Sequence, residues 1–236
     1  MTAQLEPLLV HAEAGDLVAI QAIPLPELPK KLRKRDEDGR TALHRSCAAG
    51  HNDVAKFLIA NGADPTLCDE EEWGPLHSCS SKGDSVLVSA LLEAKADPVT
   101  PTSSGATPLH FAASKGHLET LLLLMNSGAK RNVRDRHRST PLLRAAGAGH
   151  ERAVRALIEA KADPALKDRA GDNALHVAIN GQHVGVCQAL MPLDEAEDMM
   201  KQDNEDGKCP AKLLIDLQPA EMRDTIKSIW REAHGG

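Results

Sequence analysis

A leucine-histidine pair recurs along this chain at a fixed interval of 33 residues. The pairs are Leu43-His44, Leu76-His77, Leu109-His110 and Leu175-His176, and Leu142-Leu143 stands where the series lacks a histidine. Self-similarity at one period of roughly 20–50 residues is typical of arrays in which each unit buries its apolar face against the next unit. Residues 1–236 are therefore expected to form a single elongated domain whose core runs continuously through the array.

The period divides the chain into seven predicted repeats, terminal caps included. Residues 1–35 and 204–236 are expected to be atypical caps, because the ends of an array need a polar outer face. Five regular repeats lie between them, at approximately residues 36–68, 69–101, 102–134, 135–167 and 168–203. The motif Asp206-Gly207-Lys208-Cys209 follows Asp38-Gly39-Arg40-Thr41 by 168 residues, which is five periods plus three. About three residues are therefore inserted in the segment 192–201.

Each repeat is expected to be a turn followed by two antiparallel helices, which makes the fold class all-α. The first helix has start and stop signals: Thr41, Thr107 and Thr140 stand where an N-cap belongs, and Gly50, Gly83, Gly116 and Gly149 stand where a left-handed cap ends it. Glu72 and Arg138 replace the turn glycine, so those turns should be strained or differently shaped. In the tail from Pro219 to Ala233, helical spacing of Met222, Ile226, Ile229 and Trp230 predicts a helix that seals the last repeat.

Composition excludes several classes of function. A net charge of -6 argues against nucleic-acid binding, which needs a concentrated basic stripe. The longest apolar run, Leu121–Met125, has five residues, whereas crossing a bilayer takes about 20. The five cysteines are odd in number and no signal peptide precedes them, so we expect a reducing compartment, the cytoplasm and the nucleus.

Catalytic and metal chemistry find little support in the sequence. A zinc site could be imagined from His44 with Cys47 and from His77 with Cys79, but these residues stand at regular repeat positions and no carboxylate or second CxxC completes a ligand set. Glycine-rich phosphate loops, GxSxG and HExxH are absent. The basic run Lys30–Arg35 resembles a nuclear import signal, although a solvated basic face explains it better. The chain is therefore expected to be neither an enzyme nor a holder of a cofactor or metal.

The turn, the helix pair and the 33-residue period resemble the ankyrin repeat. Within that class, the segments Gly39–His44, Ala48–His51, Trp73–His77 and Thr107–Lys115 resemble the gankyrin family, seven-repeat ankyrin proteins that chaperone assembly of the proteasome regulatory particle. The resemblance covers about residues 8 to 215, and Arg40, Trp73 and Ser114-Lys115 are the matches outside the general ankyrin consensus.

The resemblance implies that a concave surface grips the C-terminal helical domain of one proteasomal ATPase subunit, with contacts from Arg40 and Lys115. This chain also departs from the family. Leu143 replaces the usual histidine, the insertion near Pro192 is unusual, and Val177–Gly181 stands where mammalian members carry an LxCxE motif for the retinoblastoma protein. Binding of that protein is therefore not implied.

Ankyrin geometry places the turn tips and the exposed face of the first helices on one concave side. Charges there segregate into an acidic patch at residues 69–72, a basic middle that includes Lys130, Arg131, Arg134, Arg138 and Arg144, and an acidic stretch at 194–198. Such a surface would steer a partner of opposite polarity, although solvated loop charge is the plain alternative. Trp73 is an interface-anchor candidate because nothing obvious packs against it, the alternative being that it shields a neighbouring turn. The predicted protein-binding residues are Glu37, Asp38, Arg40, Glu70, Glu71, Trp73, Lys82, Lys115, Arg136, His137, Arg144 and Asp172.

The sequence thus predicts a monomeric protein that binds a proteasomal ATPase subunit without nucleic acid, membrane or cofactor. Two alternatives remain open. One is an ankyrin scaffold or inhibitor that binds a kinase or a transcription factor, and the other is a zinc-dependent enzyme.

Overall fold

The structure is a computed structural model that describes residues 6–217 and 220–234. Within these residues it contains sixteen α-helices and no β-strand. The N-terminal cap contributes α1 (Pro7–Ala14), α2 (Leu17–Gln21) and α3 (Leu28–Leu32). The regular repeats contribute the pairs α4 (Ala42–Ala49) with α5 (Asn52–Ala60), α6 (Pro75–Lys82) with α7 (Ser85–Glu93), α8 (Pro108–Lys115) with α9 (Leu118–Asn126), α10 (Pro141–Gly147) with α11 (Glu151–Glu159), and α12 (Ala174–Asn180) with α13 (Val184–Leu190). The C-terminal part adds α14 (Ala196–Lys201), α15 (Pro210–Asp216) and α16 (Ala220–His234).

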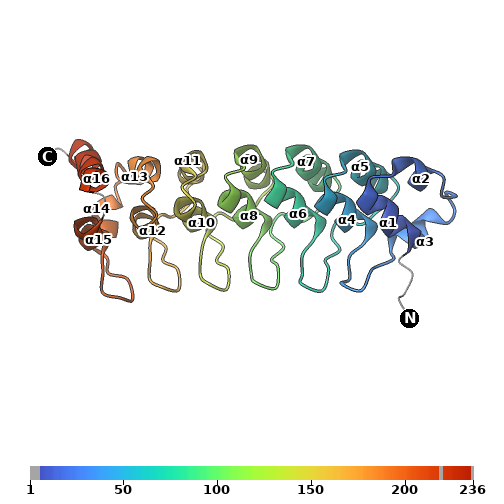
Figure 1. The fold of residues 1–236 in the computed structure, drawn as a ribbon, viewed down its shortest axis with the longest axis horizontal. Coiled ribbons are helices and arrows are strands. Elements are labelled where there is room, and N and C mark those ends of the chain that lie inside the picture. The colour runs from blue at the N-terminus through green and yellow to red at the C-terminus, as the bar shows by residue number, and fades with distance from the viewer. Residues whose placement is uncertain (1–5, 218–219, 235–236) are drawn as a thin grey trace.

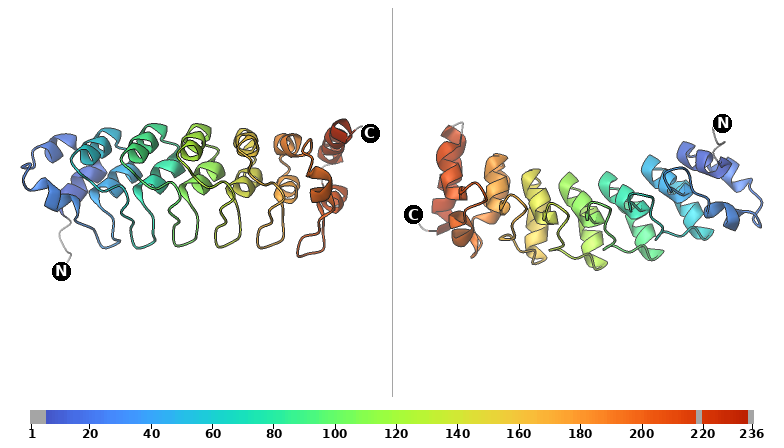
Figure 2. Two further views of the ribbon diagram at one scale, coloured as in Figure 1. Left: turned by 180° about the vertical axis from the view of Figure 1, so that it is seen from behind. Right: turned by 90° about the horizontal axis from the view of Figure 1, so that it is seen from below.

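The helix pairs stack in chain order into one long row, with the two described ends of the chain at opposite ends of the row (Figure 1). First helices of the pairs form one layer and second helices form another, while long loops project from the first layer as fingers (Figure 1). Figure 2 shows the same row from behind and from below, and the view from below shows that the row curves along its length. The expected all-α ankyrin-repeat solenoid is confirmed by this arrangement.

The first helices begin where the sequence predicts. Thr41 and Thr107 adopt an extended backbone as N-caps of α4 and α8, and the imidazole of the third helical residue accepts a hydrogen bond from each cap amide. In α8, Thr107 N donates to His110 Nδ1 at 3.0 Å. Leu43 and Leu109 lie two residues after the caps and are almost fully buried. A capped start followed by a buried leucine therefore repeats along the first layer.

Three of the recurring histidines, His77, His110 and His176, each donate a hydrogen bond to the chain segment that follows their helix pair. His110 Nε2 donates to the carbonyl oxygen of Ser139 at 3.1 Å, and His77 Nε2 donates to that of Thr100 at 3.0 Å. Burial penalises the charged imidazole and lowers the pKa of His77 and of His110 to about 4, so both rings are neutral donors near neutral pH. The structural interpretation of these histidines is confirmed.

A second histidine series ties four of the helix pairs to the pair before them, through His51, His117, His150 and His183. His117 Nε2 donates to Ser81 O at 3.1 Å, and its ring covers Gly83, the residue that ends α6 with a φ of 75°. A Cβ placed on Gly83 would lie 2.5 Å from His117 Nδ1. Glycine is thus required there both by the left-handed backbone and by the ring.

Five described non-glycine residues take the left-handed conformation that glycine has in other repeats, and two of them, Lys95 and Lys161, follow the second helices α7 and α11. Glu72 and Arg138 have φ values of 57° and 59° at the finger turns, and Gln182 has 59° after α12. Each such residue costs about 1–2 kcal/mol relative to glycine. The predicted strain at Glu72 and Arg138 is therefore confirmed.

The C-terminal cap differs from the regular repeats in two ways. The predicted insertion forms the short helix α14, whose Met199 and Met200 are buried beside α15. The predicted terminal helix is α16, which buries Ile226 and packs Met222 and Trp230 partly against the core. Pro219, where that helix was expected to begin, lies outside the described residues. The inserted segment therefore adds buried surface to the cap rather than a free loop.

Candidate protein-binding surface

The fingers are joined tip to tip by backbone hydrogen bonds. In each case an amide of one fingertip donates to a carbonyl oxygen of the preceding one. The bonds join Glu70 N to Asp38 O (3.0 Å), Ser103 N to Glu71 O (2.9 Å), Arg136 N to Ser104 O (2.9 Å), Arg169 N to His137 O (2.9 Å) and Glu205 N to Ala170 O (2.9 Å). We call this series the fingertip ladder. It holds the tips at fixed spacing and makes them one continuous edge.

Most of the predicted binding residues lie on this edge or beside it. The fingertip residues Glu37, Asp38, Glu70, Glu71, Arg136 and His137 are exposed. Lys82 and Lys115 are exposed at the C-terminal ends of α6 and α8, and Asp172 is half-buried. Ala106, which follows the third fingertip, is buried. We call the fingertips and the C-terminal ends of the first helices the binding face.

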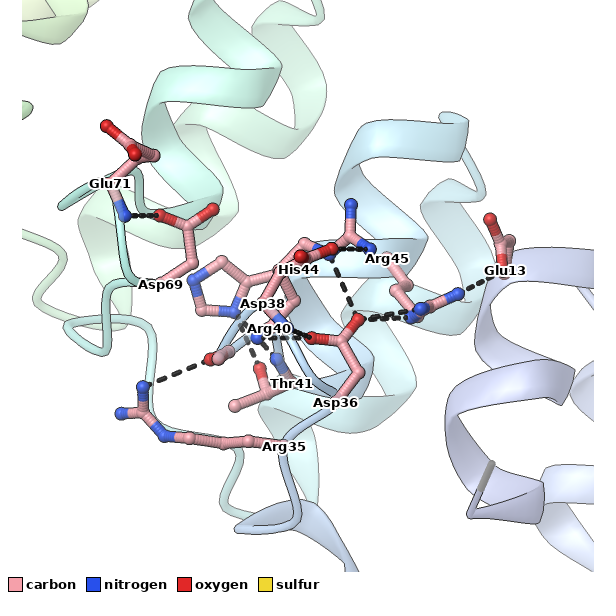
Figure 3. A network of polar contacts seen from close by, with 11 residues as sticks. Glu13, Arg35, Asp36, Asp38, Arg40, Thr41, His44, Arg45, Asp69 and Glu71 are labelled. Atoms are coloured by element: carbon pink, nitrogen blue, oxygen red, sulfur yellow. Dashed lines mark hydrogen bonds and ion pairs between the residues drawn. The ribbon is translucent and has the colours of Figure 1, made fainter. Parts of the chain in front are cut away.

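Asp36 organises the first finger through a set of ion pairs (Figure 3). One of its carboxylate oxygens accepts the amides of Asp38 and Arg40, at 3.1 and 2.8 Å. The other accepts Arg40 Nε at 3.0 Å and Arg45 Nη2 at 2.6 Å. Burial by itself would raise the pKa of Asp36, but these hydrogen bonds outweigh it and hold the pKa at about 2. Asp36 is therefore ionised at any ordinary pH.

Arg40, which the sequence predicted only as a contact residue, also has a structural role. Besides Asp36, its guanidinium binds Asp38, with Nη2 2.5 Å from Oδ2. Its side chain is nevertheless 40% exposed, so one edge of the guanidinium still faces solvent. Arg45, which was not among the predicted residues, joins Asp36 to Glu13 of the N-terminal cap. Arg40 is thus a fixed charge rather than a mobile one.

The fourth finger repeats this arrangement. Asp135 is fully buried, and its second oxygen accepts Arg144 Nε at 3.1 Å together with Arg144 Nη2. Burial would raise the pKa of Asp135, yet the bond to Arg144 and backbone amides lower it overall. Arg144, predicted as part of an open basic surface, is consequently committed to an intramolecular pair. The signal for both pairs was present in the sequence as an aspartate followed nine residues later by an arginine.

Trp73 has partners within the molecule, contrary to the expectation that nothing packs against it. Its ring centroid lies 4.5 Å from that of Phe111 and 5.5 Å from that of His77. Its indole Nε1 donates to Ser78 Oγ at 2.7 Å. Trp73 and Phe111 are both half-buried, so they present an aromatic patch between the acidic and basic parts of the binding face. Phe111 was not anticipated because it lies 38 residues from Trp73.

The charges of the fingertips change sign along the ladder. Glu37, Asp38, Glu70 and Glu71 make the first two tips acidic, Ser103 and Ser104 make the third neutral, and Arg136 makes the fourth basic. The acidic stretch near the C-terminus does not continue this edge. Asp194 and Glu195 line a different cleft of about 450 Å³, next to Lys161 and Asp163. The acidic-to-basic order of the first four fingers is therefore the main polarity of the binding face.

Metal and membrane features were also sought. The described residues include no group of three or more His, Cys, Asp or Glu side chains that could hold a metal ion. In the same part of the chain, no helix is both long enough and apolar enough to cross a bilayer. All five cysteines are free thiols, and four of them are buried.

Sequence comparisons agree with this geometry. The family model "Ankyrin repeats (3 copies)" matches residues 61–135 and 128–203, and the model "Ankyrin repeat" matches residues 38–70. Among curated proteins, the 26S proteasome non-ATPase regulatory subunit 10 of human is 40% identical over 42 residues, which is 18% of this chain and 19% of that protein. The rat protein of the same name is 40% identical over 42 residues, 18% of each chain.

A further relative is the bovine Ankyrin repeat domain-containing protein 49, 46% identical over 57 residues, or 24% of each chain. The chain thus matches about a fifth to a quarter of the length of these relatives. The family models cover much more, because together they span residues 38–203 of the 236. With its helix pairs and projecting fingers, the chain belongs to the ankyrin-repeat family of protein-binding scaffolds.

Proposed function

We propose that this ankyrin-repeat protein holds the C-terminal helical domain of a proteasomal ATPase subunit while the proteasome regulatory particle assembles. The observation that carries the proposal is the fixed polarity of the binding face, acidic at the first two fingers and basic at the fourth. A helical partner with the opposite polarity would be oriented along such a face, since complementary charge sets register and encounter rate. The short matches to proteasome subunit 10 of rat and human support the proteasome link.

Lys115 is the best single probe of this proposal. It lies at the end of α8 and is exposed. Its side chain makes no hydrogen bond or ion pair with any other described residue. Arg40, the other residue implied by the resemblance, binds Asp36 and Asp38. A binding effect of changing Lys115 can therefore be separated from an effect on folding, whereas a change at Arg40 mixes the two.

The test is calorimetric titration of the chain with the isolated C-terminal helical domain of each proteasomal ATPase subunit from the same organism. We expect one domain to bind, and Lys115→Glu to weaken it about tenfold or more, because a partly desolvated charge pair across an interface is worth about 2–5 kcal/mol. The matched control is Lys56→Glu, the same charge reversal at an exposed position of α5 in the outer helix layer. It should bind like the unaltered chain.

Failure of every ATPase domain to bind would remove the proposed partner. A kinase or a transcription factor would then be the class of partner to examine. We also propose that the protein acts as a monomer in the cytoplasm and the nucleus, which sedimentation of the purified chain and imaging of a tagged chain would check.

A further inference from the structure

Four of the fingers begin with an aspartate at the same position of the repeat, namely Asp36, Asp69, Asp135 and Asp168. In all four, the oxygen Oδ1 accepts backbone amides of the finger. For Asp168 the donors are Ala170 N at 2.8 Å and Asp172 N at 3.0 Å. Each carboxylate is therefore held in one orientation by its own finger, with the oxygen Oδ2 left for another partner.

An arginine of the same repeat occupies that second oxygen in two of the four fingers. Arg45 binds Asp36 Oδ2 through Nε at 3.0 Å, and Arg144 binds Asp135 Oδ2 through Nε at 3.1 Å. Both arginines stand nine residues after their aspartate. In the second and fifth repeats the corresponding residues are Ser78 and Val177, which carry no charge. Among the described residues, no cation binds Asp69 or Asp168.

The second and fifth repeats differ in what fills the vacant position. In the second, the indole of Trp73 bonds Ser78 and covers it. In the fifth, Asp168 lines an open cleft of about 450 Å³ together with Gly147 and Ala148 at the end of α10. Gly147 has no side chain to enter the cleft, and a Cβ placed there would approach only the Cβ of Val177, at 3.9 Å. The space beside Asp168 is thus open from the binding face.

The other groups around the cleft leave the charge of Asp168 uncompensated. Arg144 also lines the cleft, but its charge is balanced by the buried Asp135. His137 and two serines complete the polar lining. Lys167, next to Asp168 in the chain, directs its Nζ to the carbonyl oxygen of Asp203 at 2.9 Å instead. A carboxylate that is held in one orientation and has no cation bound to it suits a guanidinium, whose planar fork pairs with carboxylates through two donors.

We propose that the cleft at Asp168 receives an arginine side chain of a partner protein, seated as Arg45 and Arg144 are seated in their own repeats. The proposal rests on the binding face of the proposed function but not on the identity of the partner. It adds a cation-accepting position within the otherwise basic half of that face. A partner would therefore need an arginine there in addition to a general charge pattern.

Titration of the chain with a small arginine compound tests this directly. The full chain, labelled with ¹⁵N, is titrated with Nα-acetyl-arginine methylamide as the probe and with the matched lysine compound. We expect saturable shifts of the Ala170 and Asp172 amide signals, and an affinity for the lysine compound several-fold lower. Asp168→Asn should weaken the affinity for the arginine compound about tenfold or more. The fold should be kept, because Asn204 already makes the same Oδ1 hydrogen bonds to the backbone of its own finger. Asp69→Asn is the matched control and should leave these shifts unchanged.

A variant that carries the missing arginine in its own chain gives a second measurement. Val177→Arg places the missing side chain nine residues after Asp168, and we expect its Tm to exceed that of Val177→Gln. The difference should vanish when Asp168→Asn is added, and probe binding should be lost in Val177→Arg. If Val177→Arg does not fold, the titration with Asp168→Asn decides alone.

The proposal is overturned if Asp168→Asn binds the arginine probe as the unaltered chain does, if the lysine compound binds equally well, or if the Tm difference in cis persists without the carboxylate. Because the titration contains no ATPase domain, its result is independent of the proposed function. Probe binding at Asp168 together with failure of every ATPase domain would contradict only the proteasome proposal.

Discussion

Arg40 and Arg45 share one carboxylate but differ in how much they contribute to the folded state. Asp36 is 4% exposed, Arg45 12% and Arg40 40%. Removing one partner of an ion pair that is largely shielded from water lowers the free energy of unfolding strongly, because the remaining charge is left buried. Removing one partner of an exposed pair lowers it less, because solvent screens the pair. The two arginines therefore allow a comparison at a single carboxylate.

We expect Arg45→Gln to lower the free energy of unfolding by about 3 kcal/mol and Arg40→Gln by about 1 kcal/mol. Urea denaturation at pH 7 would measure both. Charge reversal at Arg40 should cost more than Arg40→Gln, since a carboxylate would then face Asp36. Equal losses in the two glutamine variants would mean that Asp36 is more hydrated than its burial indicates.

The buried histidines should make stability depend on pH. The pKa of His77 and of His110 falls from an ordinary 6.5 to about 4 in the folded chain, chiefly through burial. Below pH 6.5 the unfolded state therefore binds protons that the folded state does not. The contribution of each histidine to the free energy of unfolding is complete above pH 6.5 and is lost as the pH falls toward 4. Each such histidine contributes a slope of about 1.4 kcal/mol per pH unit within that window.

We expect the urea midpoint to decrease steadily from pH 7 to pH 5, and His77→Gln to reduce the slope of this decrease. His137→Gln, at an exposed fingertip, should leave the slope as it is. A midpoint independent of pH over this range would show that the buried rings take up protons without unfolding.

At the scale of elements, the contact between a helix-ending glycine and the histidine of the next pair sets the stacking of the helix pairs. Gly83→Ala should destabilise the chain by more than the roughly 1–2 kcal/mol of a left-handed alanine, because its Cβ would also collide with the ring of His117. Gly128→Ala is the matched control, since Gly128 is left-handed with a φ of 96° but has nothing within 4 Å of the added Cβ. Thermal unfolding of the two variants would compare them, and equal Tm values would mean that the ring moves aside freely.

Features that depend on a residue's own backbone could be predicted from the sequence. The caps at Thr41 and Thr107 and the left-handed Glu72 and Arg138 are of this kind, because capping and turn chemistry act within a few residues. The ion pairs of Arg40 with Asp36 and Asp38 were not predicted, because turn chemistry indicates the backbone conformation but not which side chains meet. The contact of Trp73 with Phe111 was not predicted because Phe111 comes from the next repeat. The helix α14 was also not predicted. The inserted residues shift the 33-residue period, and this shift gives their number but not their conformation.

At the scale of the whole molecule, each repeat is stabilised mainly by its two neighbours. Leu109 is fully buried in the third regular repeat. We expect Leu109→Ala to cost about 2–5 kcal/mol, as removal of a buried leucine does in other cores. Hydrogen exchange should then quicken first in α8 and in the adjacent α6 and α10. Faster exchange that begins at the two caps instead would place the weakest interface elsewhere.

The fingertip ladder gives the array a mechanical property. Neighbouring tips are joined by one amide-to-carbonyl bond apiece, so a force along the row of tips is carried by every one of these bonds. A small opening of every such bond changes the radius of the whole curve. A partner held at both the acidic and the basic fingers would therefore fix the curvature of the row between them.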